Sequence, residues 1–291
     1  MFLCKNKRAM NKDLVLNFKI TNWCNLNCTH CCERSGANEA PNFISLEKME
    51  KYFAESRKMS IRPNELVTFG GGESMAPYLH GDMKYIPSVL NVAYVYGYVP
   101  TFKTNGTWGD NDFLRKRILS DIAVCAYRGG KLVTLDISVD EFHHNHDGIV
   151  KIIRDVLCNP DLCYAIRICL VGFDTLGSQL ASMKLQNMLQ KSGFKIQKTD
   201  KLTFNDWIVF APNSNDGVYI VNDFTANVYS LGRAKDNNIY TALGNPKDAR
   251  RNCLQIDNKD TAILNYVYRE PINNRPLNEV LNSLFRQAHL R

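Results

Sequence analysis

The chain has 291 residues, of which 45% are hydrophobic and 22% charged, and its formal charge is +7. This composition excludes wholesale disorder and low-complexity architectures. No apolar stretch approaches the roughly 20 residues that a membrane-spanning helix needs, so we expect no membrane insertion. Residues 1–12 are basic and lack an apolar h-region, so we expect no secretory signal and a cytoplasmic location. Without export, the ten cysteines are poor candidates for disulfides and better candidates for metal ligands or buried apolar residues.

The first two-thirds of the chain alternates between predicted strands and helices. The predicted strands are 14–21, 66–69, 101–104, 133–140 and 165–171. The predicted helices are one that Ser45 caps, 112–127, 149–157 and 177–191. This alternation is typical of right-handed βαβ units with a parallel sheet.

The strands at 133–140 and 165–171 place apolar residues on one side and polar residues on the other. Parallel strands that are buried on both faces would be continuously apolar. A polar inner face that lines a cavity, with an apolar outer face under helices, indicates an incomplete barrel. We therefore predict an α/β fold in which residues 1–191 form a partial (β/α)6 TIM-like barrel.

After residue 191 the pattern changes. Short strands are predicted at 207–211, 218–221 and 227–231, and helices at 261–269 and 277–289. We expect residues 192–291 to form a small C-terminal cap of short strands and helices that faces the substrate.

The strongest motif follows the first strand, where Cys24, Cys28 and Cys31 have the spacing C-x3-C-x2-C. Three thiolates on one loop can each hold one iron of a cubane and leave the fourth iron open, whereas clusters with cysteine ligands alone normally use four. Structural zinc is the alternative, but it usually takes two separated cysteine pairs, and the remaining cysteines are scattered. Uncoordinated buried cysteines are a further alternative. Cys32 directly follows the motif, and we interpret it as a packing residue.

These residues resemble the radical S-adenosylmethionine (SAM) enzymes. The resemblance covers the cysteine loop, the Gly-Gly-Glu after the second strand and the order of strands and helices, over about residues 1–191. It implies a [4Fe–4S] cluster on Cys24, Cys28 and Cys31, with SAM chelating the open iron. Reductive cleavage of SAM would give a 5′-deoxyadenosyl radical that abstracts hydrogen from a substrate. The cofactors would carry out this chemistry, which is oxygen-sensitive.

The resemblance also implies residues that bind SAM. Gly71, Gly72 and Glu73 match the Gly-Gly-Glu whose backbone meets the SAM ammonium group, although a plain strand-to-loop turn is the alternative. The family usually has proline after this glutamate, and Ser74 stands there instead. His30 precedes the third cysteine, at a position near the adenine.

Further candidates are polar residues of the inner face. Asn105, Ser138 and Asp140 lie at predicted strand ends, where ribose hydroxyls need polar partners. Arg167 is a candidate partner of the SAM carboxylate, because guanidinium binds carboxylate through two hydrogen bonds. The alternative for each is an ordinary polar residue or a surface ion pair.

A histidine-rich stretch follows Asp140 and includes His143, His144 and His146. Its spacing is similar to that of metal ligands, but the sequence offers no partner cluster. We interpret the stretch as a substrate-side loop and treat a second metal there as the minor alternative.

The C-terminal third suggests a substrate class. Residues 218–230 and the Leu-Gly-Asn at 243–245 resemble a degenerate, cluster-free SPASM/twitch-like domain, since only Cys253 lies beyond Cys169. A peptide or protein side chain is therefore the expected substrate, and modification of RNA or a nucleotide is the alternative that the charge of +7 permits. A non-enzymatic iron–sulfur or zinc protein is the rival class. An enzyme would need an external electron donor such as flavodoxin or ferredoxin, and a small-molecule substrate stays open.

Overall fold

The computed structural model describes most of the barrel segment and parts of the C-terminal third. The described residues are 14–59, 63, 65–173, 175–198, 207–212, 217–226, 253–259, 261–264 and 268–289. The chain divides into two compact units, of which unit 1 comprises Met1–Asn27, Glu33–Thr101 and Leu243–Arg291. Unit 2 comprises Cys28–Cys32 and Phe102–Ala242. Strand β3 (Val99–Thr104) begins in unit 1 and ends in unit 2.

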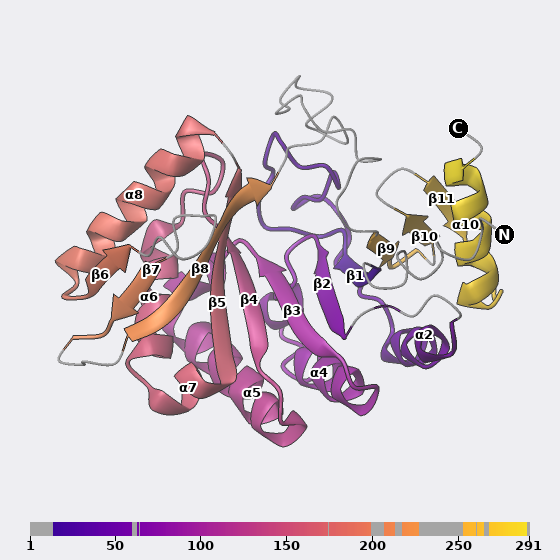
Figure 1. Cartoon of the computed structure of the whole chain (residues 1–291), viewed down its shortest axis with the longest axis horizontal. Coiled ribbons are helices and arrows are strands. Elements are labelled where there is room, and N and C mark those ends of the chain that lie inside the picture. The colour runs from indigo at the N-terminus through magenta and orange to yellow at the C-terminus, as the bar shows by residue number, and fades with distance from the viewer. Residues whose placement is uncertain are drawn as a thin grey trace, which may run out of the picture. The chain divides into compact units, whose positions relative to one another are not determined.

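Unit 1 combines a mixed sheet with helices (Figure 1). Its elements are β1 (Val15–Thr21), α2 (Leu46–Lys58), β2 (Leu66–Gly71), α3 (Ala76–Leu79), α4 (Tyr85–Val95), β9 (Cys253–Ile256), β10 (Thr261–Leu264), β11 (Tyr268–Pro271) and α10 (Leu277–His289). The strands lie in the order β11-β10-β9-β1-β2. Strand β1 pairs in parallel with both β2 and β9, whereas β10 pairs antiparallel with β9 and β11.

The core of unit 1 forms around β1. Leu16, Phe18 and Ile20 are fully buried on one face, and the ring of Phe18 lies 4.9 Å from that of Phe53 on α2. The opposite face carries Lys19, whose ammonium would be costly to bury alone. Its ion pair with Glu33 resolves this cost. Burial by itself would raise the pKa of Glu33, but the charge of Lys19 and the hydrogen bonds from Lys19 and Gln255 hold that pKa below its ordinary value.

Unit 2 continues the alternation of strands and helices. Its elements are η1 (Thr107–Asp110), α5 (Asp112–Gly129), β4 (Val133–Ser138), α6 (His146–Leu157), α7 (Pro160–Ala165), β5 (Ile166–Phe173), α8 (Leu176–Lys191), β6 (Lys195–Lys198), β7 (Trp207–Phe210) and β8 (Gly217–Ala226). The strand order is β4-β5-β8-β7-β6. Strands β4, β5 and β8 run parallel, and β7 pairs antiparallel with both β8 and β6. Helices α5 and α7 pack beside β5 (Figure 1).

The alternation predicted for β4 and β5 is confirmed. Leu135 and Ile137 of β4 are fully buried, while Asp136 and Ser138 point to the other face and are half-buried. The register pairs Ser138 with the half-buried Val171 of β5, so the less buried face of β4 continues on β5. Burying each large aliphatic side chain contributes about 1.5–3 kcal/mol, which fixes which face of β4 meets the helices.

The predicted α/β class with parallel strands is confirmed. Within each unit the described strands form an open row. An open row is consistent with a partial barrel, whereas the strands of a closed barrel have no free edge. No helix among the described residues is both long and apolar enough to cross a bilayer.

The structure departs from the sequence analysis in the C-terminal third. The boundary predicted after residue 191 falls between α8 and β6, yet β8 pairs with β5, so the sheet of unit 2 continues past it. The helix predicted at 261–269 is wrong, because β10 and β11 occupy this stretch as an antiparallel pair. The helix predicted at 277–289 is confirmed. The segments 227–231 and 243–245 lie outside the described residues.

Candidate functional site

The cysteine loop begins where β1 ends. Its base is closed by two backbone hydrogen bonds of 3.2 Å, one from Cys24 N to the Gly36 carbonyl and one from Gly36 N to the Asn22 carbonyl. Further along, Cys31 N donates to the Cys28 carbonyl at 3.2 Å and forms a turn. Cys24, Cys28, Cys31 and Cys32 are all half-buried, and none of these four thiols forms a disulfide. Cys24 belongs to unit 1, and the other three belong to unit 2.

In unit 1, Gly71 and Gly72 bring the end of β2 against the chain that leads into Cys24. Gly72 N donates to the Thr21 carbonyl at 2.8 Å, and Glu73 N donates to the Trp23 carbonyl at 2.9 Å. A Cβ on Gly72 would lie 1.8 Å from the Trp23 oxygen, and Gly71 has a φ of 103°, so glycine is required at both positions. The Gly-Gly-Glu therefore holds the first cysteine in place.

The carboxylate of Glu73 turns back into unit 1. The residue is 1% exposed, and Oε1 accepts a hydrogen bond of 2.9 Å from Met75 N. Ser74, where the family usually has proline, is fully buried. Serine at this position therefore still packs into the protein.

In unit 2, His30 packs among aromatic residues. Its ring stacks on Phe142 at 4.2 Å and meets Phe173 and His143 edge-on at 5.2 and 5.4 Å. The stretch between Cys28 and Cys31 thereby rests on the loop that follows β4. The sequence analysis identified His30 but not these contacts.

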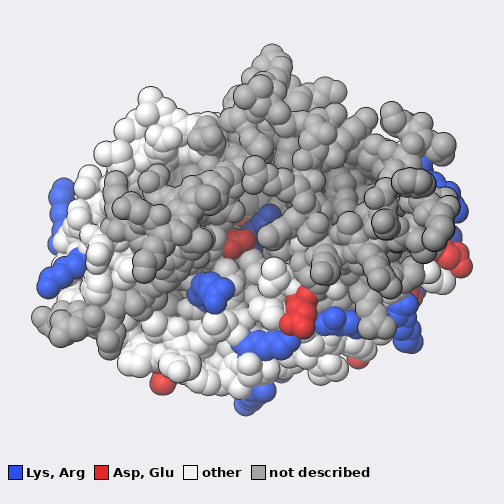
Figure 2. All heavy atoms as spheres, in the orientation of Figure 1, with Lys and Arg blue, Asp and Glu red and all other residues white. Residues whose placement is uncertain are grey.

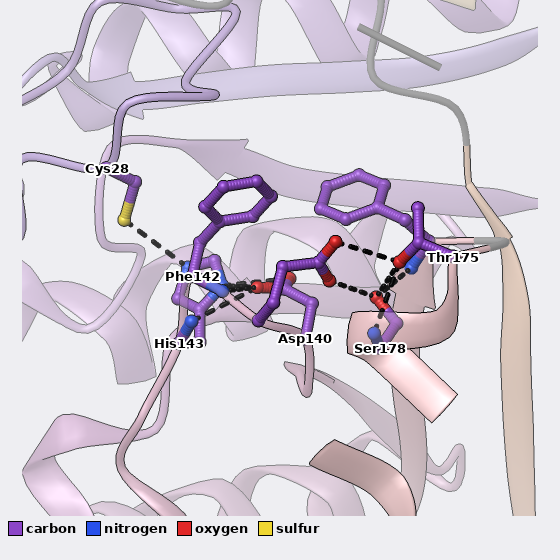
Figure 3. A network of polar contacts seen from close by, with 8 residues as sticks. Cys28, Asp140, Phe142, His143, Thr175 and Ser178 are labelled. Carbon is purple, nitrogen blue, oxygen red and sulfur yellow. Dashed lines mark hydrogen bonds and ion pairs between the residues drawn. The ribbon is translucent and has the colours of Figure 1, made fainter. Parts of the chain in front are cut away.

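Asp140 and His143 form a buried pair beside Cys28 (Figure 3). His143 Nδ1 lies 2.8 and 2.9 Å from the two Asp140 oxygens, and His143 Nε2 lies 3.8 Å from Cys28 Sγ. Burial alone would lower the pKa of His143, but the hydrogen bonds to Asp140 and Cys28 raise it to about 10. Burial would raise the pKa of Asp140, but His143 holds that pKa below its ordinary value.

The other predicted SAM contacts differ in their setting. Ser138 is the half-buried last residue of β4. Asn105 is 6% exposed, and its Oδ1 accepts hydrogen bonds from Thr107 N at 3.0 Å and Thr107 Oγ1 at 2.7 Å, which makes a local turn. Arg167 is exposed at the amino end of β5, although it lies on the polar face beside Thr134. Because ligands of parallel sheets bind at the carboxyl ends of strands, this position does not favour a contact with SAM.

The sequence analysis did not predict the contacts of the histidine-rich stretch. His143 joins Cys28, His30 and Asp140 in unit 2, whereas His144 is exposed. His146 is buried at the start of α6, where burial lowers its pKa. The signal was the spacing of Asp140 and His143 at a strand end, but their partner Cys28 lies 115 positions earlier in the chain.

The residues present fit an iron–sulfur cluster. Three half-buried thiols without disulfides follow one strand, and sulfur is the ligand that such clusters take. The close approach of Gly72 to the Trp23 backbone fixes the position of the chain directly before Cys24. The same stretch of chain thus offers a donor set of the right chemistry.

The comparisons agree with this donor set. Residues 18–161 match the family model described as the Radical SAM superfamily, and this segment contains every cysteine of the motif. A search of curated proteins finds no match.

Several solved structures are similar to the chain. One is hexahistidine-tagged anSMEcpe with bound AdoMet (SAM), at 13% identity, 92% of this chain, 77% of that chain and a TM-score of 0.49. Native anSMEcpe with bound AdoMet is 18% identical over 62% of this chain and 49% of that chain, with a TM-score of 0.37. BtrN in complex with AdoMet and 2-DOIA is 16% identical over 54% of this chain and 55% of that chain, with a TM-score of 0.34. The chain spans about half the length of the latter two structures, and these TM-scores are too low to support an argument.

The family assignment therefore rests on the matched segment and on the cysteine loop inside it. Proteins of this family bind a [4Fe–4S] cluster and SAM, and these are the cofactors of this chain. Residues 18–161 of this chain are a radical SAM superfamily segment.

Proposed function

We propose that the chain is a radical SAM enzyme whose cluster is held by Cys24, Cys28 and Cys31. The observation that carries this proposal is the C-x3-C-x2-C loop inside the matched segment, with half-buried thiols that form no disulfide. When bound, the cluster and SAM supply the reductive cleavage that generates a 5′-deoxyadenosyl radical for hydrogen abstraction. The protein's contribution is to bind, orient and exclude water.

Individual residues would divide these tasks. The backbone of Gly71, Gly72 and Glu73 would meet the SAM ammonium group, since glycines allow the main chain to approach closely. His30 would lie near the adenine, and its stacking on Phe142 supports a fixed ring orientation. Ser138 would bind a ribose hydroxyl, which its half-buried position at the end of β4 supports.

Three candidates carry weaker support. Asn105 and Asp140 use their side-chain oxygens in local hydrogen bonds, so a contact with the ribose would have to add to these. Arg167 is exposed at the amino end of β5, and we give it no part in the proposed site.

The proposed substrate is a peptide or protein side chain, presented by the C-terminal segment. The support is the SPASM/twitch-like pattern at 218–230 and 243–245, most of which lies outside the described residues. RNA or a nucleotide is favoured only by the net charge of +7. Figure 2 shows basic, acidic and uncharged side chains interspersed over the described part of one face, which adds no basic stripe of the kind that nucleic-acid surfaces carry. We further propose a cytoplasmic location and an external donor such as flavodoxin or ferredoxin.

A non-enzymatic zinc protein is the second candidate. One observation favours it: ligand atoms of His30, Asp140 and His143 all lie within 4.8 Å of one another. Such a centre would draw on imidazole and carboxylate ligands, which zinc accepts.

Anaerobic reconstitution with iron and sulfide, followed by dithionite and SAM, separates these candidates. The parent chain is expected to take up roughly four irons and to release 5′-deoxyadenosine. Cys28→Ala should lose both the cluster absorbance and the product. Cys32→Ala, which removes an adjacent half-buried thiol of the same loop, should keep both. Zinc without iron, or a parent that cleaves no SAM, would rule the enzyme out.

A further inference from the structure

Helix α8 of unit 2 carries a row of exposed apolar side chains. Leu176, Leu180 and Met183 are 71%, 56% and 56% exposed. Residues that follow one another by four and then three positions lie on one face of a helix. Single exposed apolar residues are ordinary on a protein surface, whereas an aligned row of them indicates a surface that binds another molecule.

The row lies on the side of α8 that faces away from the core. The opposite side packs on β5, β6 and α6 (Figure 1) and buries Ser178, Ala181, Ser182, Leu185 and Leu189. At 3.6 residues per turn, Leu180 and Met183 are about 140° and 160° round the helix from Leu185. The packing of α8 within unit 2 therefore does not use the row, and its apolar surface stays in contact with solvent.

The spacing of the row continues to the end of the helix. Asn187 and Gln190 are also exposed and follow Met183 in steps of four and three positions. Alternating steps of four and three are the spacing of a coiled-coil seam, and the α8 seam comprises Leu176, Leu180, Met183, Asn187 and Gln190. A seam of this width packs against one helix, whereas a helix that lies on a membrane has a broader apolar face with aromatic residues. The α8 seam therefore favours a helix as its partner.

Charge specifies the partner further. Residues 175–198 contain four lysines and no acidic residue. Of these, Lys184 and Lys191 are exposed, and each directly follows a residue of the α8 seam, on the same side of the helix. Residues that flank such seams select partners through their charges, because opposite charges attract across the seam and like charges repel. A second copy of α8 would bring no acidic residue to these lysines, whereas a helix with aspartate or glutamate beside its own seam would.

The N-terminus of α8 is held in place by side chains (Figure 3). Thr175 is the N-cap and accepts a hydrogen bond of 3.1 Å from Ser178 N. Glu141 accepts hydrogen bonds from Thr175 Oγ1 at 2.8 Å and Ser178 Oγ at 2.7 Å. A helix that is already ordered loses less conformational entropy on binding than a segment that must fold first. The α8 seam is thus preorganised for a partner helix.

We propose that the α8 seam is a docking surface for an acidic amphipathic helix of another protein. Apolar residues of that helix would cover Leu176, Leu180 and Met183. Its carboxylates would lie beside Lys184 and Lys191. The inference goes beyond the proposed function and does not require the cluster, because α8 carries none of the cluster cysteines.

A synthetic peptide tests the proposal. The probe is a fluorescein-labelled peptide of three heptads with leucine at both seam positions of each heptad and glutamate at the flanking positions, since shorter helices are marginal in water. Fluorescence anisotropy measures its binding to the reconstituted chain. A matched peptide with lysine in place of glutamate is the control for charge.

Variants of the chain locate the binding on α8. Leu180→Asn and Met183→Asn each remove one apolar side chain of the seam, and Lys184→Gln removes one flanking charge. Val95→Asn is the matched control, because Val95 is 79% exposed at the end of α4 in unit 1. All these side chains are exposed, so the variants are expected to melt within about 2 °C of the parent. If Leu180→Asn does not fold, Met183→Asn takes its place in the comparison.

The parent and Val95→Asn are expected to bind the acidic peptide equally and to leave the basic peptide unbound. The affinity should fall about tenfold or more in Leu180→Asn and Met183→Asn, and about twofold to fivefold in Lys184→Gln. No binding, equal binding of the two peptides, or parent-like binding in both asparagine variants of the seam would overturn the proposal. So would a dimer in sedimentation that Leu180→Asn dissociates, which would identify a second copy as the partner. Binding to vesicles of anionic phospholipid that Leu180→Asn abolishes would also overturn it, in favour of a membrane surface.

Discussion

Replacing Gly72 by alanine tests how the Gly-Gly-Glu positions the first cysteine. The new Cβ would lie 1.8 Å from the Trp23 oxygen and 2.6 Å from the Trp23 carbonyl carbon. Ordinary van der Waals contact begins at 3.4 Å, so the first distance is about 1.6 Å short. The new Cβ would clash with backbone atoms of Asn22 and Trp23, so a change of side-chain rotamer cannot relieve the clash.

The expected cost follows from these contacts. Overpacking of this kind costs about 1–3 kcal/mol, and the hydrogen bonds from Gly72 N and Glu73 N are each worth about 1 kcal/mol. A total loss of about 3 kcal/mol would lower the melting temperature by roughly 6–12 °C. Because the displaced carbonyl belongs to Trp23, Cys24 should move with it, and iron uptake should fall.

Anaerobic thermal melts and iron content after reconstitution measure both effects. Gly130→Ala is the control, since Gly130 has a φ of 64° but nothing within 4 Å of the added Cβ. It should lose about 1 kcal/mol through backbone strain alone and take up iron as the parent does. If Gly72→Ala melts like the parent and binds as much iron, the Gly-Gly-Glu does not hold the cysteine loop.

Two further substitutions test the packing of unit 2. Arg115→Ala removes hydrogen bonds of 2.7 Å to both Asp155 and the Gly109 carbonyl. We expect urea unfolding to show that the free energy of unfolding falls by about 2–3 kcal/mol, with iron uptake unchanged. A fall below about 0.5 kcal/mol would contradict this expectation. Glu141→Ala removes both acceptors at the N-terminus of α8 and should cost about 1–3 kcal/mol, with faster hydrogen exchange in the first turn of that helix. Exchange at the parent's rate would show that Glu141 does not stabilise the first turn of α8.

Local patterns predicted the elements whose signals are local. Ser45 accepts a hydrogen bond from Lys48 N and begins α2, as its residue type indicated. The alternation in β4 placed Leu135 and Ile137 in the core and Ser138 on the opposite face. In these cases a cap or a period of two carries the information.

Other elements depend on partners that are distant in the sequence. Residues 261–269 are apolar and lack a clear period, and only pairing with β9 makes their first part a strand. Helix α4 was missed, because its sequence is apolar almost throughout and shows no stripe. Strand β8 was predicted only in part, and its pairing with β5 leaves no local trace.

The candidate site divides in the same way. The spacing of Cys24, Cys28 and Cys31 is local and was sufficient to identify the family segment. The contact of His143 with Cys28 joins residues 115 positions apart, and no spacing within residues 141–146 could reveal it. The exposure of Arg167 follows from its place at the start of β5, which the alternation alone did not specify.

Mössbauer spectroscopy of the chain reconstituted with ⁵⁷Fe, before and after addition of SAM, tests most directly whether three cysteines leave one iron open. SAM is expected to change the signal of about one iron in four and to leave the others as they were. A spectrum that SAM does not alter, or a chain that takes up no ⁵⁷Fe, would contradict the assignment of the cysteine loop.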